Sequence, residues 1–222
     1  MLFRSKTKFR HVNGNYNIAH LIDDWADIQI GGSFREYELN SNGTIFTDID
    51  GPIKYNEYGA YLQVQKKFLD DRLKFTGSAR YDKNEFFDGL LSPRVSFAYT
   101  LGEERNHNLR VSVQQGFRNP TTQDLFIGLN AGRAILVGSA PANLDRDVRT
   151  FEVSAPGQAL IGQSTVQLVG RDAYENAYST ASLQAGAPEA VNTPLVQPEE
   201  ITAFEAGYRG QVGKFTIDLS GY

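Results

Sequence analysis

The sequence lacks cysteine altogether and has a single methionine, which is the first residue. Without cysteine, disulfide bonds and thiol redox chemistry are excluded. Basic residues are outnumbered, with 22 Lys and Arg against 26 Asp and Glu and a formal net charge of −4, so no nucleic-acid partner is expected. Apolar runs fall well short of the roughly 20 residues that a membrane-spanning helix needs. The first charge follows only three residues, which is too early for a secretory signal.

What the sequence does have is a composition typical of β-structure, with 11 Tyr, 14 Phe and 21 Gly spread along the chain. The mean hydropathy is −0.39. A soluble β protein has such a value, and so does a membrane barrel in which only every second strand residue faces lipid. Hydropathy therefore does not decide between the two classes.

Several segments alternate between apolar and polar side chains with the period of a β-strand. The run LKFTGSARYD (residues 73–82) alternates without an error, and RVSFAYTL, LRVSV, FEAGYR and FTIDLS follow the same rule. Runs at 12–21, 25–39 and 58–68 follow it less cleanly. We therefore expect about eight strands, each with one apolar and one polar face.

The links between these strands alternate in length. Short links with turn chemistry are expected at 70–71, 102–106 and 210–213, and longer ones at 40–56, 83–91 and 118–200. If the strands are antiparallel, all short links fall at one end of the sheet and all long links at the other. This layout predicts an all-β fold, an antiparallel up-and-down transmembrane β-barrel with short periplasmic turns and long extracellular loops.

A soluble antiparallel sandwich or lipocalin-like barrel is the alternative, with its apolar face in a core. Three features favour the membrane barrel instead. Tyr and Phe lie near the strand ends, as in the aromatic girdles at membrane interfaces. The polar faces contain residues of both charges together with Ser, Thr and Gln, which suits a hydrated lumen. The predicted links are short at one end of the sheet only.

The long link at 118–200 opens with the stretch GFRNPTTQDLF and is rich in Ala, Gly, Asn, Gln and Pro. Arg118 continues the polar register of its strand, so its guanidinium should enter the lumen near the outer rim. Pro120 should end the strand, Thr121 to Asp124 should cap a turn, and the pair at 125–126 should pack back. We expect a folded extracellular insertion with one or two short helices, for example at 144–151. Arg118 and Asn119 have two interpretations: a strand terminator with an internal salt bridge, or a ligand contact.

Residues that could carry chemistry are scarce. The three histidines His11, His20 and His107 are far apart, lie in or beside predicted turns and lack metal-ligand spacing. Asp48, Asp50 and Glu57 hint at calcium, but the spacing fails the EF-hand loop and an acidic loop tip is favoured. No nucleophile elbow, phosphate loop or zincin motif is present. We expect no catalytic residue, no metal, no cofactor and no enzyme activity; an outer-membrane phospholipase would need a Ser–His pair that no histidine offers.

Three segments resemble those of TonB-dependent outer-membrane receptors, and together with ELNSNGTIFTD (residues 38–48) they are most similar to receptors of the Bacteroidetes type. GFRNPTTQDLF is similar to a Gly-Phe-Arg-x-Pro segment of that family, VQPEEITAFEAGYRG to the segment that opens a later barrel strand, and GSARYDKNEFF with SPRVSFAYTL to a hairpin of the barrel. The positions that match the family pattern are Arg118, Asn119, Pro120, Glu199 and Glu205. We expect wall or lumen roles for these five before ligand contact.

The resemblance implies a receptor in the outer membrane of a Gram-negative bacterium, in contact with outer-membrane lipid, that imports a small or medium ligand. Its partner would be the TonB–ExbB–ExbD complex, acting through a plug domain. A family receptor has a signal, a TonB box, a plug and about 22 strands, so we expect residues 1–222 to be one partial barrel domain without signal, box or plug. A small complete barrel stays open, as does a passive porin or adhesin. Siderophore, cobalamin, glycan and peptide all remain open as ligands.

Overall fold

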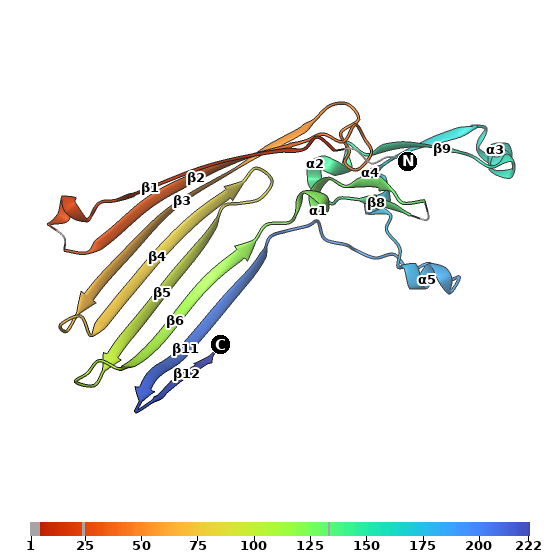
Figure 1. The fold of residues 1–222 in the computed structure, drawn as a ribbon. Coiled ribbons are helices and arrows are strands. Elements are labelled where there is room, and N and C mark those ends of the chain that lie inside the picture. The colour runs from red at the N-terminus through yellow and green to blue at the C-terminus, as the bar shows by residue number, and fades with distance from the viewer. Residues whose placement is uncertain (1–4, 24, 133) are drawn as a thin grey trace. The chain divides into compact units, whose positions relative to one another are not determined.

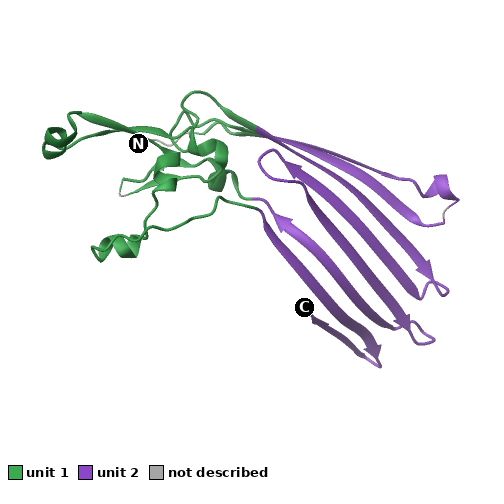
Figure 2. Cartoon of the chain, turned by 180° about the vertical axis from the view of Figure 1, so that it is seen from behind, with its two compact units in different colours: residues 1–8, 37–54, 120–197 green, residues 9–36, 55–119, 198–222 purple. Residues whose placement is uncertain are grey.

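The computed structural model describes the whole chain except residues 1–4, 24 and 133. The chain forms two compact units (Figure 2). Unit 2 comprises 9–36, 55–119 and 198–222, and unit 1 comprises 37–54, 120–197 and the described residues up to Lys8.

One antiparallel sheet of eight strands, in the order β1-β2-β3-β4-β5-β6-β11-β12, contains all the long strands (Figure 1). Their bounds are β1 Lys8–Asn17, β2 Asp27–Leu39, β3 Ile53–Phe68, β4 Leu73–Asn84, β5 Leu90–Leu101, β6 His107–Arg118, β11 Glu199–Val212 and β12 Phe215–Gly221. The 3-10 helix η1 (Ala19–Ile22) lies between β1 and β2. The sheet is open, with β1 and β12 as its edges. The expected strand number and up-and-down order are confirmed.

The predicted alternation of link lengths is confirmed only in part: 40–52 and 119–198 are long, but the β4–β5 link at 85–89 is as short as the β5–β6 link at 102–106 and shorter than the β1–β2 link at 18–26. The β3–β4 and β11–β12 turns are short, and Asp70 and Asp71 take positive φ angles of 52° and 65° in the first of them. Asp tolerates this left-handed conformation better than most residues, which explains the Asp-Asp pair there. The first strand runs over 8–17 rather than 12–21.

The two faces of the sheet differ in chemistry, as cross-strand pairing makes clear. One row pairs Phe75 with Phe97 and Phe97 with Val111. The next row, on the other face, pairs Thr76 with Ser96, Ser96 with Ser112, and Ser112 with Glu205. Phe97 and Leu109 are each 43% exposed and Phe215 is 76% exposed. The apolar face is therefore not sealed in a globular core, which contradicts the soluble sandwich.

Aromatic side chains mark both ends of the apolar face. Phe34 and Tyr58 stack with ring centroids 6.2 Å apart near the long links. Trp25 and Phe68 lie near the short links and are both exposed. This distribution matches the interface girdles that the sequence predicts. No helix in the described part of the chain is long and apolar enough to cross a membrane.

Unit 1 contains short helices and strands that the sequence pattern does not predict. Its helices and strands are α1 Thr122–Phe126, β7 Gly128–Asn130, β8 Ile135–Val137, α2 Pro141–Leu144, β9 Val148–Glu152, α3 Ala155–Ile161, β10 Thr165–Val169, α4 Gly170–Glu175 and α5 Thr180–Gln184. The helix expected at 144–151 is wrong: α2 ends at Leu144, and Val148 and Phe151 pair with Val169 and Val166 in a β-hairpin. Five helices, rather than one or two, lie in the described part of 120–197.

Unit 1 has a small buried core. Leu39, Leu125, Phe126 and Leu144 are each at most 1% exposed. A Cβ on Gly138 would lie 2.6 Å from backbone atoms of residues 125 and 126, so only glycine permits this close packing. The expectation that the pair at 125–126 packs back is confirmed.

The β2–β3 link belongs to the same core. The amide of Thr47 donates to the Phe126 carbonyl (3.2 Å), and the amide of Gly128 donates to the Ile45 carbonyl (2.8 Å). Asp48 is only 3% exposed, and its carboxylate accepts hydrogen bonds from the Ser41 amide, the Ser41 hydroxyl (2.7 Å) and the Gly43 amide (2.7 Å). The prediction of an acidic loop tip is wrong for Asp48, because this carboxylate organises the link from inside. It is also wrong for Glu57, which lies within β3 with a side chain that is only 12% exposed.

Candidate functional site

The ends of strands β6 and β11, where the long 120–197 segment leaves and rejoins the sheet, are held together by an ion pair. Arg118 and Glu199 are cross-strand partners, and Arg118 Nη2 donates to Glu199 Oε1 at 2.9 Å. Both side chains are more than two-thirds exposed, at 75% and 71%. The pair therefore adds little to stability but defines the register at the base of the segment.

Beyond Arg118 the strand ends as the sequence predicts. Thr121 Oγ1 accepts from the Asp124 amide (3.2 Å), and Asp124 Oδ2 accepts from the Thr121 amide (2.8 Å). This reciprocal pair is a capping box at the start of α1. Pro120 has no amide proton to donate, so the ladder cannot continue past Asn119.

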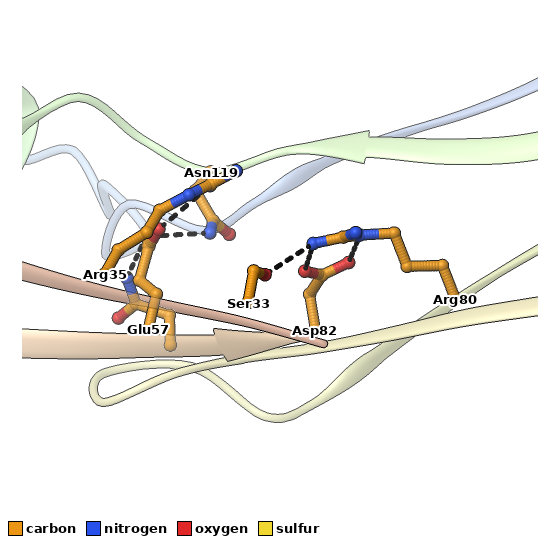
Figure 3. Close-up of polar contacts among 7 residues, drawn as sticks. Ser33, Arg35, Glu57, Arg80, Asp82 and Asn119 are labelled. Carbon is orange, nitrogen blue, oxygen red and sulfur yellow. Dashed lines mark hydrogen bonds and ion pairs between the residues drawn. The ribbon is translucent and has the colours of Figure 1, made fainter. Parts of the chain in front are cut away.

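Glu57 is the centre of a polar cluster within unit 2 (Figure 3). Its side chain is 12% exposed and forms an ion pair with Arg35 at 3.3 Å. Glu57 Oε1 also accepts from Asn84 Nδ2 (2.7 Å) and Asn119 Nδ2 (3.1 Å). One carboxylate on β3 thus connects side chains of β2 and β4 and the residue that follows β6. A buried charge needs such partners, because an unpaired one is costly.

A second cluster lies on the same face, between β2, β3 and β4. Arg80 Nε and Nη2 each donate to an oxygen of Asp82 at 2.6 Å, and Nη2 also reaches Ser33 Oγ at 3.1 Å (Figure 3). This bidentate geometry is the strong form of an Arg–carboxylate pair. A Cβ on Gly59 would lie 2.3 Å from Asp82 Oδ1, so glycine is required for the cluster to form.

The third set of charges lies further along the polar face. Arg110 Nε lies 3.3 Å from Glu205 Oε1, and Arg110 Nη2 lies 3.7 Å from Asp218 Oδ1. A cavity of about 230 Å³ beside this pair is lined by Lys74, Arg94, Arg110 and Glu205, among others. Because cations outnumber carboxylates in its lining, the cavity suits an anionic group more than a cationic one.

The five positions predicted from the sequence do not form one site. Arg118 and Glu199 lie together, and Asn119 joins the Glu57 cluster. Glu205 is six residues further along β11 and pairs with Arg110, about 20 Å from Glu199 at the rise of a strand. Pro120 supplies only the strand end. Glu57 is a structural centre that the sequence did not predict. Its alternation with Gly59 and Tyr61 along β3 could have indicated that Glu57 lies on the polar face of the sheet.

Metal ligation has no geometric support in the residues that the structure describes. No group of three or more His, Asp or Glu side chains there could hold a metal ion. His11 lies within β1 rather than beside a turn, and His107 Nδ1 lies 2.7 Å from the hydroxyl of Tyr208. The arrangement is that of a charged, hydrogen-bonded wall.

Comparison with solved structures identifies proteins of similar fold. The siderophore receptor PirA of Pseudomonas aeruginosa is 14% identical with a TM-score of 0.56 over 97% of this chain and 31% of its own. PirA of Acinetobacter baumannii is 14% identical with a TM-score of 0.56. The ferric enterobactin receptor PfeA of P. aeruginosa is 15% identical with a TM-score of 0.56. Each of these two alignments covers 97% of this chain and 26% of the other. The chain thus spans less than a third of these proteins.

A search of curated proteins found no match. Among family models, the one described as "TonB dependent receptor-like, beta-barrel" matches residues 3–222. This match covers nearly the whole chain and agrees with the open antiparallel sheet and its two unlike faces. The chain therefore belongs to the family of TonB-dependent receptor-like β-barrels.

Proposed function

We propose that this chain forms part of the barrel wall, and one extracellular loop region, of an outer-membrane receptor that takes up a ligand by TonB-dependent transport. The observation that carries the proposal is the inverted sheet, in which Phe97 and Leu109 are 43% exposed while the carboxylates of Glu57 and Asp82 are only 12% and 17% exposed on the other face. Lipid on one side and a hydrated lumen on the other account for both exposures.

In this proposal the TonB–ExbB–ExbD complex supplies energy through a plug domain within the complete barrel. Residues 118–200 form the extracellular surface, and Arg118, Asn119, Glu199 and Glu205 hold the wall that supports it. The Bacteroidetes subtype rests on the resemblance of the three sequence segments together with ELNSNGTIFTD at 38–48. The solved structures of similar fold are named as siderophore receptors, and at 14–15% identity they support the fold rather than the ligand.

Deletion of unit 1 residues tests the role of the long segment. Because Arg118 and Glu199 are cross-strand partners, residues 120–197 can be replaced by Asn-Gly, which leaves a short hairpin between β6 and β11. Ligand uptake should be lost in the intact receptor while membrane insertion is kept. A matched control replaces only 153–164 with Asn-Gly, because Glu152 and Thr165 are also partners. Unchanged uptake in the larger deletion would refute the role of this segment.

Energy dependence separates TonB-dependent transport from a passive porin. Cells carrying the receptor are offered a ferric siderophore, cobalamin, a glycan and a peptide, with and without a protonophore. Uptake of one of these that stops with the protonophore supports the proposal. Uptake that continues without a proton-motive force would instead indicate a passive porin.

A further inference from the structure

One lysine lies on the apolar face of the sheet near the short links. Lys66 on β3 pairs with Phe75 on β4, and Phe75 pairs with Phe97 on β5. Directly opposite residues in an antiparallel sheet share a face. The ammonium group of Lys66 is therefore attached to the face that otherwise carries apolar side chains.

Aromatic rings surround this ammonium group. Lys66 Nζ lies 3.5 Å from the centroid of the Trp25 ring and 5.7 Å from that of Phe68. The two rings are 63% and 42% exposed, so the group they form is open to the surroundings. The faces of the aromatic rings stabilise the cation electrostatically, but the ammonium group keeps its full positive charge.

Lys66 differs from its sequence neighbour in its partners. Lys67 points to the opposite face and lies 3.3 Å from Asp71 Oδ2. Within the described residues, no carboxylate lies within ion-pair distance of Lys66 Nζ. Asp27, the one carboxylate among the described residues that line a cavity of about 290 Å³ beside Lys66, already accepts from Asn17 at 2.6 Å. In the part of the chain that the structure describes, Lys66 therefore has aromatic partners but no ion-pair partner.

The position of Lys66 along the strand places it at one edge of the apolar band. A second lysine of this face, Lys83, pairs with Tyr58 near the long links and donates to the Phe87 carbonyl at 2.5 Å. Lys66 and Tyr58 are eight residues apart on β3, which is about 26 Å along a strand and about 20 Å along the normal of a barrel with tilted strands. This length approaches the ~25 Å apolar band of outer-membrane barrels. Lys66 therefore lies at the level of lipid head groups.

We propose that Lys66, supported by Trp25, binds the phosphate of an anionic phospholipid head group at the short-link edge of the apolar face. The proposal rests on the membrane position in the proposed function. The ammonium group supplies the charge, and the exposed indole covers the adjoining acyl chain, since tryptophan favours the interface between head groups and hydrocarbon. Binding at this edge fixes the depth of the wall in the membrane.

Lipid retention in nanodiscs tests the site. The complete receptor is reconstituted in a mixture of phosphatidylglycerol and phosphatidylcholine, extracted into mild detergent, and the lipids that stay bound are counted by native mass spectrometry. Lys66→Gln should weaken the preference for phosphatidylglycerol about fivefold, the effect of one lysine near an anionic surface. Trp25→Ala should weaken it several-fold, and Lys66→Arg should keep it. Lys67→Gln, the matched control on the opposite face, should have no effect.

The possible results have distinct meanings. Equal retention of phosphatidylglycerol by the wild type and Lys66→Gln, with both inserted, overturns the lipid site and leaves the proposed function standing. Displacement of the lipid by millimolar inorganic phosphate alone would mean a site for free phosphate, and also overturns it. Failure of the wild type to insert would overturn the membrane position and this site with it.

Discussion

The two units of the chain place the same kinds of side chain in opposite surroundings. In the sheet of unit 2, Val95, Phe97 and Leu109 are 38–43% exposed, while the charged residue Glu57 has a side chain that is only 12% exposed. In unit 1, Leu125 and Phe126 are at most 1% exposed. Unit 1 thus has the buried apolar core of a protein folded in water. In the sheet, apolar side chains are exposed and charged ones such as Glu57 are largely shielded.

This difference teaches that one sequence is adapted to two solvents. Apolar burial drives folding only where water is the alternative, so unit 1 gathers its apolar residues inside. In the proposed membrane position the apolar face has no water to escape from and stays exposed, while polar residues such as Glu57 and Asp82 form ion pairs with arginines on the opposite face of the sheet. Substitutions should therefore have opposite effects in the two units.

The largest effect is expected in the core of unit 1. Phe126→Ala removes a ring that is 1% exposed and should lower the free energy of unfolding of this unit by about 3–5 kcal/mol. Hydrogen exchange of amides in 120–150 measures the loss. Leu160→Ala, at a side chain 86% exposed, is the control and should have almost no effect. Equal protection in Phe126→Ala and the wild type would contradict the core assignment.

The next effect is expected on the apolar face of the sheet. Val95→Arg should destabilise the folded barrel by about 2–4 kcal/mol if the side chain lies near the bilayer midplane. Its neighbour Ser96 lies on the polar face, where it pairs with Thr76 and Ser112, so Ser96→Arg should be tolerated. Denaturant titration in lipid vesicles measures both. A larger loss for Ser96→Arg would reverse the assignment of the faces.

A smaller effect is expected from the buried carboxylate of the β2–β3 link. Asp48→Ala leaves the amides of Ser41 and Gly43 without their acceptor, which should cost about 1–3 kcal/mol. Protease cleavage within 40–52 should become faster, because the link loses its internal support. Asp50→Ala, at an exposed neighbour in the same link, serves as the comparison, and equal cleavage rates in the two variants would refute the role of Asp48.

The smallest effect is expected at the base of the long segment. The ion pair of Arg118 and Glu199 is exposed on both sides, so Arg118→Ala should change the free energy of unfolding by less than about 1 kcal/mol. Glu57→Ala removes the shared acceptor of Arg35, Asn84 and Asn119 and should cost more. Denaturant titration measures the free energy of unfolding of both variants. A larger loss for Arg118→Ala than for Glu57→Ala would show that the exposed ion pair stabilises the sheet more than the Glu57 cluster does.

The strands of the sheet could be predicted from the sequence because period two is a local property. Residues 73–82 need no distant partner to reveal which side chains share a face. The elements of unit 1 could not be predicted this way. Leu144, Val148 and Phe151 have helical spacing, yet Val148 and Phe151 belong to a strand because β10 provides partners for them.

The candidate site could be predicted only in part, for the same reason. The pairing of Arg118 with Glu199 follows from the two strand ends that the long segment joins. The Glu57 cluster depends on the curvature that brings Asn119 to within hydrogen-bonding distance of β3. No spacing in the sequence encodes that approach, because residue 57 lies on β3 and residue 119 follows β6, and these two strands are not adjacent in the sheet.

The account depends most on the direction in which neighbouring residues of one strand point, and spin labels on β6 test it directly. Because the chain has no cysteine, Val113→Cys and Ser112→Cys each introduce one labelling site into this part of the reconstituted receptor. The label at 113 should collide with oxygen dissolved in lipid and the label at 112 with a water-soluble nickel complex. Equal access of the nickel complex to both labels would contradict a lipid-facing sheet.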